Sequence, residues 1–370
     1  MEKLVSEVYF ADLRTTLEEN LLDKLKRLIV TAGISKIDFE GKFCAIKIHF
    51  GEPGNLAFLR PNFAKVIVDF VKEKGGKAFL TDSNTLYVGG RKNALDHIDS
   101  AYLNGYSPFS TGAHIIIADG LKGTDESLVK VEGAKYVKEA KIGRAIMDAD
   151  IIISLTHFKC HELTGIGGAI KNLGMGSGSR AGKMEMHSEG KPSVIVEQCI
   201  GCGACIKVCA HNAPSITNKK AEIDCNKCVG CGRCIGVCPK DAIDAAGDET
   251  NEILSMKMSE YTAAVIRGKP NFHINIVKDV SPYCDCHSEN DVPVVEDVGI
   301  FASFDPIALD QACAEAVNKK PVAANSMLAA KAQTHNDRFT DAHPSTNWKI
   351  QIEHAEKLGL GNRKYKLITI

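Results

Sequence analysis

The densest group of reactive side chains in this chain is a run of cysteines near its middle. Residues 199–209 have the spacing Cys-x2-Cys-x2-Cys-x3-Cys, and the same spacing recurs at residues 228–238. Three thiolates two residues apart can wrap one face of an iron–sulfur cubane, while the fourth reaches the other cluster in two-cluster ferredoxins. The alternative, a pair of zinc sites, normally uses two cysteine pairs separated by a long gap. The spacing therefore predicts two [4Fe–4S] clusters.

The ferredoxin rule divides the cysteines into two sets of four ligands. The set predicted for the first cluster is Cys199, Cys202, Cys205 and Cys238. The set predicted for the second cluster is Cys228, Cys231, Cys234 and Cys209. Cys225 is surplus to both sets, so it is either a spare thiol or an alternative ligand.

A second group of polar side chains follows a predicted buried strand that ends near residue 155. Its members are His157, Lys159, Cys160, His161 and Lys171. The glycines at positions 165, 167, 168, 174, 176 and 178 would let backbone N–H groups converge on an anion. We therefore predict that the two histidines and the two lysines are catalytic or bind a small anionic substrate. The alternative is a flexible glycine-rich loop with surface histidines.

A third group is the sequence Cys284-Asp-Cys286, which His287 follows directly. Two soft thiolates beside an imidazole suit iron, zinc or copper. We predict an additional metal centre at Cys284 and Cys286, with Cys160 as a candidate third ligand. The alternative is two buried free thiols.

Two further candidates stand at the ends of predicted strands. His49 ends the apolar segment 43–49, and Asp82 ends the segment 77–82. Ligands of open α/β sheets bind at the carboxyl ends of the strands, so both residues are candidate catalytic groups. The alternatives are a histidine that bonds to nearby backbone and an ordinary polar turn.

The elements that would position these residues alternate between helical and strand patterns. Strand-like segments at 43–49, 77–82, 113–119 and 150–155 are separated by helical ones, including 16–30, where Thr16 is the predicted cap, and 62–74. The pattern stops near residue 191 and resumes after residue 245. We predict an α/β fold, a mostly parallel open sheet with helices on both faces, formed by residues 1–190 and 246–370. A small α+β two-cluster ferredoxin-like domain at 191–245 would interrupt it, and three consecutive domains are the alternative.

Several motifs, in the same order along the chain, resemble the domain-of-unknown-function 362 family of iron–sulfur proteins. These motifs are Asp82-Ser-Asn-Thr-Leu-Tyr87, His157-Phe-Lys-Cys-His161, Gly167-Gly-Ala-Ile-Lys-Asn-Leu-Gly-Met-Gly176, Cys284-Asp-Cys286 and Ala302-Ser-Phe-Asp-Pro-Ile-Ala308. The resemblance spans most of the chain, and the ferredoxin repeat interrupts it as in many members. It implies a protein typical of anaerobic bacteria and archaea, with no agreed reaction. It also implies a fold similar to the N-terminal part of lactate-racemase-like proteins, which bind a nickel–pincer nucleotide.

Composition and charge limit the remaining classes of function. The chain has 370 residues, 14 cysteines and a formal net charge of −1, so no basic footprint for nucleic acid is visible. No apolar run is long enough to span a membrane, and the N-terminus does not resemble a signal peptide. So many cysteines without a secretion signal indicate a reducing compartment, and we expect a cytoplasmic protein.

The leading hypothesis is an anaerobic oxidoreductase whose ferredoxin module relays electrons to a site in the α/β domain. Its expected partner is a redox protein, namely a ferredoxin, a flavodoxin or an oxidoreductase. One alternative is a non-enzymatic carrier of electrons, metal or clusters for a partner enzyme. A further alternative is a metal-cofactor enzyme related in fold to lactate-racemase-like proteins. A flavin stays open as an additional cofactor, because flavin sites often lack a short motif.

Overall fold

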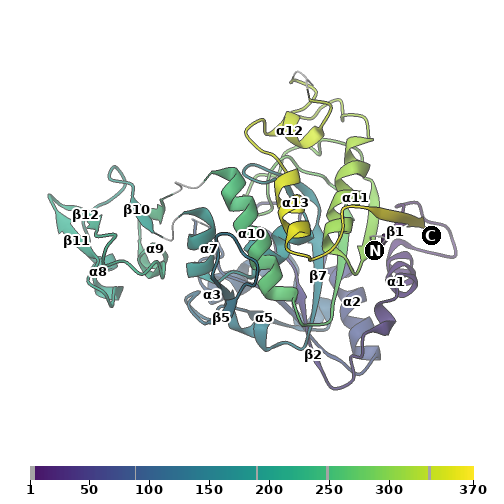
Figure 1. The fold of residues 1–370 in the computed structure, drawn as a ribbon, viewed down its shortest axis with the longest axis horizontal. Coiled ribbons are helices and arrows are strands. Elements are labelled where there is room, and N and C mark those ends of the chain that lie inside the picture. Colours follow the sequence, from purple (N-terminus) through teal and green to yellow (C-terminus); the bar gives the residue numbers. More distant parts are fainter. Residues whose placement is uncertain (1–4, 88, 189–190, 247–249, 332–334) are drawn as a thin grey trace.

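The computed structural model describes residues 5–87, 89–188, 191–246, 250–331 and 335–370. Its centre is an eight-stranded sheet with the order β16-β1-β15-β14-β7-β2-β3-β4 (Figure 1). The strands are β1 (Ser6–Ala11), β2 (Phe43–Lys47), β3 (Lys77–Asp82), β4 (His114–Ile117), β7 (Ile151–His157), β14 (Asn271–Val277), β15 (Gly299–Ser303) and β16 (Tyr365–Thr369). Only β15 runs antiparallel to its neighbours in this sheet.

Helices cover both faces of this sheet because its strands are apolar on both sides. Ala45 of β2 packs into one core, while its neighbours Cys44 and Ile46 pack into the other. One face carries α1 (Leu21–Thr31), α2 (Pro61–Glu73) and α3 (Ala94–Leu103). The other carries α6 (Ala169–Ser177), α10 (Asn251–Ile266), α11 (Pro306–Asn318) and α13 (Lys349–Lys357). The predicted mostly parallel sheet with helices on both faces is confirmed.

Shorter elements surround the sheet. The helices are η1 (Ile34–Lys36), α4 (Pro108–Thr111), α5 (Arg144–Asp148), α7 (Arg180–His187) and α12 (Arg338–Ala342). Two hairpins pair β5 (Glu126–Lys130) with β6 (Glu139–Gly143) and β8 (Lys159–His161) with β9 (Gly165–Gly167). One predicted boundary was wrong: α1 begins at Leu21, because Asn20 caps it by accepting from the amides of Leu22 and Asp23.

The cysteine-rich segment projects from the side of the sheet unit, next to α7 and α10 (Figure 1). Its elements are β10 (Pro192–Val194), α8 (Ala204–Val208), β11 (Pro214–Thr217), β12 (Lys220–Ile223), α9 (Arg233–Val237) and β13 (Ile243–Ala245). These strands form two separate antiparallel pairs, β10 with β13 and β11 with β12. Strands from both sides of the segment in sequence, such as β7 and β14, lie side by side in the large sheet. The division of the chain into two domains stays a prediction.

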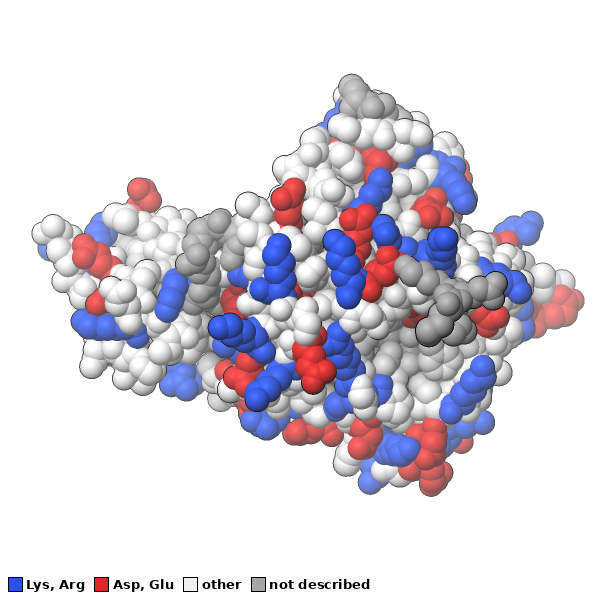
Figure 2. Space-filling model, viewed as in Figure 1, with Lys and Arg blue, Asp and Glu red and all other residues white. Residues whose placement is uncertain are grey.

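The surface carries no broad region of one charge on the face shown in Figure 2, where basic and acidic side chains are interspersed. Among the residues that the structure describes, no helix combines the length and apolar character that a membrane crossing requires.

Candidate functional site

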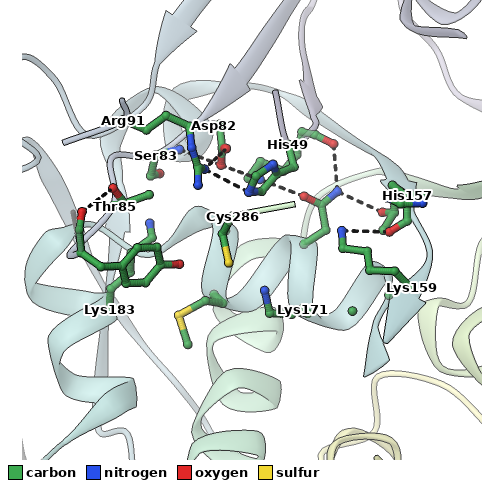
Figure 3. Close-up of a pocket in the computed structure, with 18 residues that line it drawn as sticks. His49, Asp82, Ser83, Thr85, Arg91, His157, Lys159, Lys171, Lys183 and Cys286 are labelled. Carbon is green, nitrogen blue, oxygen red and sulfur yellow. Dashed lines mark hydrogen bonds and ion pairs between the residues drawn. The ribbon is translucent and has the colours of Figure 1, made fainter. Parts of the chain in front are cut away.

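A polar pocket lies at the carboxyl ends of β2, β3 and β7, and we call it the strand-end pocket (Figure 3). Parallel strands place their carboxyl ends at one edge, so polar residues that follow different strands converge there. Five of the six predicted catalytic residues line this pocket, namely His49, Asp82, His157, Lys159 and Lys171. The sixth, His161, lines an adjoining cavity that shares Lys171 and Cys286 with the pocket.

Ion pairs hold one wall of the strand-end pocket. Lys47 Nζ lies 2.9 Å from Asp82 Oδ1, and both side chains are buried. Burial alone would raise the pKa of Asp82, but the charge of Lys47 holds it well below its ordinary value. Arg91 Nε lies 2.7 Å from Glu52 Oε2, and its Nη1 lies 3.0 Å from His49 Nε2. Burial and the charge of Arg91 lower the pKa of His49 well below its ordinary value, so its ring is neutral.

Two lysines of the pocket have no carboxylate partner among the described residues. Lys183 Nζ donates to the carbonyl oxygen of Gly178 at 2.5 Å, and burial lowers its pKa to about 8. Lys171 Nζ donates to Cys284 Sγ at 3.3 Å. Burial alone would lower the pKa of Lys171, but the neighbouring charge of Cys284 raises it above its ordinary value. Cationic groups without carboxylate partners can bind an anion in a water-poor pocket.

His157 and Lys159 contact a residue that sequence reasoning missed. Asp285 is completely buried, and its carboxylate accepts from His157 Nδ1 at 2.9 Å and from Lys159 Nζ at 2.9 Å. The local sequence carries one signal for this residue, which is its position between two cysteines. The two predicted catalytic residues thus fix the loop that bears Cys284 and Cys286.

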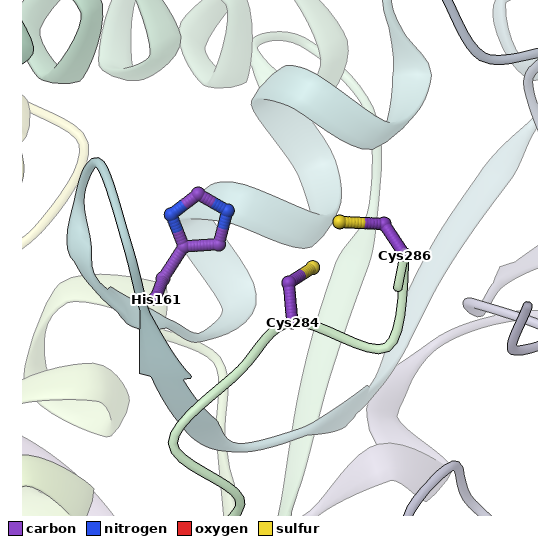
Figure 4. Close-up of side chains that lie close together, drawn as sticks. All are labelled: His161, Cys284 and Cys286. Carbon is purple, nitrogen blue, oxygen red and sulfur yellow. The ribbon is translucent and has the colours of Figure 1, made fainter. Parts of the chain in front are cut away.

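The second cavity brings three candidate metal ligands together. One ligand atom each of His161, Cys284 and Cys286 lies within 4.8 Å of the others (Figure 4). Cys160, the predicted third ligand, is not one of them, because neighbouring residues of a strand point to opposite faces. Its side chain packs into the apolar core, where burial raises its pKa. His161 takes the place that the sequence prediction gave to Cys160.

The glycine-rich stretch does not form an open anion-binding loop, which corrects that prediction. Gly165 and Gly167 belong to β9, and Gly174 and Gly176 belong to α6. A Cβ atom at Gly174 would collide with the carbonyl oxygen of Met258 in α10. Glycine at this position therefore lets α6 and α10 approach closely.

In the cysteine-rich segment, one cavity is lined by Cys199, Cys202, Cys205 and Cys238. Backbone amides donate to sulfurs here: Ala221 N lies 3.2 Å from Cys199 Sγ, and Ala242 N lies 3.2 Å from Cys238 Sγ. Such N–H···S bonds stabilise thiolates that hold an iron–sulfur cluster. The residues present therefore fit such a group.

The second set of cysteines is less enclosed. Gly230 N donates to Cys228 Sγ at 3.4 Å. Burial, together with the charges of Cys228 and Cys231, raises the pKa of Cys234 to about 12. Cys209 is half-buried, whereas the surplus Cys225 is exposed.

The cysteine-rich segment meets the pocket through the loop that follows β3. Leu86 is buried in one apolar cluster with Cys199 and Cys205. Tyr87 packs against the same cluster and also lines both the strand-end pocket and the second cavity. Asp244 and Ala245, at the end of the segment, line the second cavity too. Two residues thus connect the cysteines to the pocket.

Comparisons with known proteins give one family and several remote likenesses. The sequence model of the family described as "Domain of unknown function (DUF362)" matches residues 44–315. The chain is 27% identical over 127 residues to the thylakoid-associated protein sll1697 of Synechocystis sp. (strain ATCC 27184 / PCC 6803 / Kazusa), and this stretch is 33% of this chain and 34% of that protein.

Two solved structures match part of the chain remotely. The lactate racemase apoprotein from Thermoanaerobacterium thermosaccharolyticum is 12% identical, with a TM-score of 0.35, over 74% of this chain and 51% of that chain. A protein from Thermotoga maritima is 15% identical, with a TM-score of 0.39, over 72% of this chain and 52% of that chain. The chain spans about half the length of these structures and about a third of the curated relative.

Proposed function

The chain belongs to the DUF362 family, and we propose that it is an iron–sulfur electron-transfer protein, an oxidoreductase that delivers electrons to its strand-end pocket. The observation that carries the proposal is the cavity lined by Cys199, Cys202, Cys205 and Cys238. Cys238 comes from the second motif and joins three cysteines of the first, as the ligand rule of two-cluster ferredoxins requires.

Under this proposal the segment holds two [4Fe–4S] clusters with the ligand sets given above. Each cluster would supply one electron at low potential. Leu86 and Tyr87 support a route from the cysteines to the pocket, because Leu86 belongs to the apolar cluster that includes Cys199 and Cys205, and Tyr87 packs against that cluster. Tyr87 also lines both cavities, and Leu86 lines the second cavity. The external donor or acceptor would be a ferredoxin, a flavodoxin or another oxidoreductase of the cytoplasm.

The substrate proposed for the pocket is a small anion. Lys171 and Lys183 would bind it, since neither forms a salt bridge with a described residue. His49 would shape the wall of the pocket, because the backbone N–H of Gly51 and Nη1 of Arg91 contact its two ring nitrogens. His157 and Lys159 would act indirectly, by positioning the loop of Asp285. A protein that only carries electrons or metal to a partner does not need a buried pocket with two cationic side chains that lack carboxylate partners. The pocket therefore favours the oxidoreductase over the non-enzymatic carrier.

The test is iron and acid-labile sulfide analysis of anaerobically purified protein, with electron paramagnetic resonance of the reduced form. We expect about eight irons and eight sulfides per chain and two interacting paramagnetic centres. Cys202→Ser should lose cluster iron, whereas Cys225→Ser, which alters the exposed surplus thiol, should keep it. Zinc in place of iron at the cysteines of the two motifs would contradict the proposal, and so would an iron content that accounts for one cluster per chain.

A further inference from the structure

We propose that His161, Cys284 and Cys286 bind one thiophilic divalent metal ion, of the zinc or ferrous type, with an open coordination position facing the second cavity. One ligand atom of each residue lies within 4.8 Å of the others, which is the spacing that a single ion needs. The inference extends the proposed function by adding a metal centre beside the pocket. It does not depend on whether the cysteine-rich segment holds iron–sulfur clusters.

Protein contacts hold the loop of the two cysteines in place. The side chain of Asp285 points toward His157 and Lys159. The side chains of its two sequence neighbours, Cys284 and Cys286, point the other way, toward His161. Backbone bonds hold the same loop: Cys284 N donates to Glu162 Oε1 at 3.1 Å, and Glu52 N donates to the carbonyl oxygen of Asp285 at 2.9 Å. Both sulfurs are therefore held close together beside His161.

The donor set has a known chemical preference. Two thiolates with one imidazole, and a fourth position left for water or substrate, is one of the ligand sets of catalytic zinc. The soft sulfurs exclude magnesium and calcium, which prefer oxygen ligands. Lys171 and His187 line the cavity that the open position faces. A substrate oxygen on the metal would therefore lie near the ammonium group of Lys171.

Hydrogen bonds from His161 and Lys171 to Cys284 are the alternative to metal binding at this site. His161 Nδ1 accepts from the amides of Leu163 and Thr164, each at 3.2 Å, so the other ring nitrogen points toward the sulfurs (Figure 4). Without a metal, that nitrogen carries the ring proton, and Lys171 donates to Cys284 Sγ. The alternative to a metal ion is thus a thiolate of Cys284 that two N–H donors stabilise.

The experiment uses the full chain, purified anaerobically, with all metals quantified per chain. We expect one zinc or iron ion beyond the cluster iron. The double variant Cys284→Ser/Cys286→Ser should lose this ion, and Cys160→Ala should keep it, because Cys160 adjoins His161 in β8 but packs into the core. A variant with Cys202→Ser and Cys231→Ser should lose cluster iron and keep the additional ion, which separates this inference from the proposed function.

A second measurement uses the cluster-deficient variant, which is stripped of metal with a chelator and titrated with cobalt(II). One equivalent should produce thiolate-to-cobalt charge-transfer absorption together with the ligand-field bands of a four-coordinate ion. Adding Cys284→Ser/Cys286→Ser should abolish these bands, which excludes cobalt bound to the six motif cysteines that remain. No stoichiometric zinc or cobalt binding, with Cys284 free to react with an alkylating agent, would overturn the proposal in favour of a metal-free thiolate.

Discussion

His157 Nδ1 lies 2.9 Å from Asp285 Oδ1, and its Nε2 lies 2.8 Å from the carbonyl oxygen of Lys278. Both partners can only accept, so both ring nitrogens donate and the ring is an imidazolium. Burial alone would raise the pKa of Asp285, but His157 and Lys159 hold it far below its ordinary value. A buried carboxylate with two cationic partners ties β7 and β8 to the cysteine loop.

Replacing Asp285 should therefore destabilise the protein. Asp285→Asn leaves the charges of His157 and Lys159 buried and unpaired, and we expect the free energy of unfolding to fall by about 3–5 kcal/mol. Denaturant unfolding followed by the fluorescence of Trp348, the only tryptophan, measures this. The control is Asp279→Asn, because the side chain of Asp279 is 41% exposed and pairs with Lys278 at the surface. Its loss should cost less than about 1 kcal/mol. Equal losses in the two variants would contradict the role given to Asp285.

If the cysteine motifs hold the proposed clusters, Arg180 should set the potential of one of them. Its buried side chain packs against Gly232 and Gly236, and its guanidinium faces Cys231 and Cys234. A cation stabilises the reduced, more negative cluster, so Arg180→Gln should lower the reduction potential of the second proposed cluster, whose ligands include Cys231 and Cys234. A redox titration monitored by electron paramagnetic resonance measures the potential.

Arg233 provides the matched control for Arg180, because it lies in the same cysteine motif but is exposed. Solvent screens its charge, so Arg233→Gln should leave the potential nearly unchanged. The role of Arg180 is refuted if both variants shift the potential equally, or if neither does.

Lys183 should make the protein more stable when its charge is removed. Its pKa in the folded protein is about 8, whereas an unfolded lysine titrates near pH 10.4. Below pH 8 both states are protonated, and the full cost of burying the charge is present. Between pH 8 and 10 the unfolded chain binds more protons, so the stability of the wild type rises with pH.

We expect Lys183→Met to raise the free energy of unfolding at pH 7 by up to about 3 kcal/mol, with the gain shrinking toward pH 10. Lys47→Met is the comparison, because it removes the ammonium group that lies 2.9 Å from the buried Asp82 carboxylate and should destabilise. Unfolding curves at several pH values test both variants. A stabilisation that does not change with pH would show that the charge of Lys183 is not its cause.

Two substitutions in α6 should have opposite effects. Gly174→Ala would force a methyl group against the backbone of α10, so we expect the free energy of unfolding to fall by about 1–3 kcal/mol despite the better helix propensity of alanine.

The hydroxyl of Ser177 is buried without a hydrogen-bond partner among the described residues. Ser177→Ala removes that cost and should stabilise by up to about 1 kcal/mol. Thermal unfolding of both variants tests these two predictions. Stabilisation by Gly174→Ala would show that α6 and α10 can separate at little cost in free energy.

The sequence predicted the sheet and the place of the pocket better than it predicted individual roles. Apolar strands separated by helices specify a parallel sheet, and the carboxyl ends of such strands share one edge, so His49, Asp82 and His157 could be grouped in advance. The role of His157 could not be predicted, because its partner Asp285 lies 128 residues away along the chain.

The wrong prediction of Cys160 as the third metal ligand has a local cause. β8 has three residues, which is too short for hydrophobic alternation to show which side chain faces the cavity. The prediction of an anion-binding loop from the glycines failed for a different reason. Gly174 provides room for a contact between two helices, and such contacts produce no characteristic spacing in the sequence.

The position of β15 between β1 and β14 affects how the chain can be synthesised. β1 leaves the ribosome before the other strands of the sheet, yet its neighbours β15 and β16 are translated only after the cysteine-rich segment. During that interval the cysteines would be accessible to the factors that assemble the proposed clusters, while β1 has two open edges that can pair with another nascent chain. Overproduction faster than the supply of iron and sulfide should therefore yield aggregates, and slow expression with added iron and cysteine should yield folded protein.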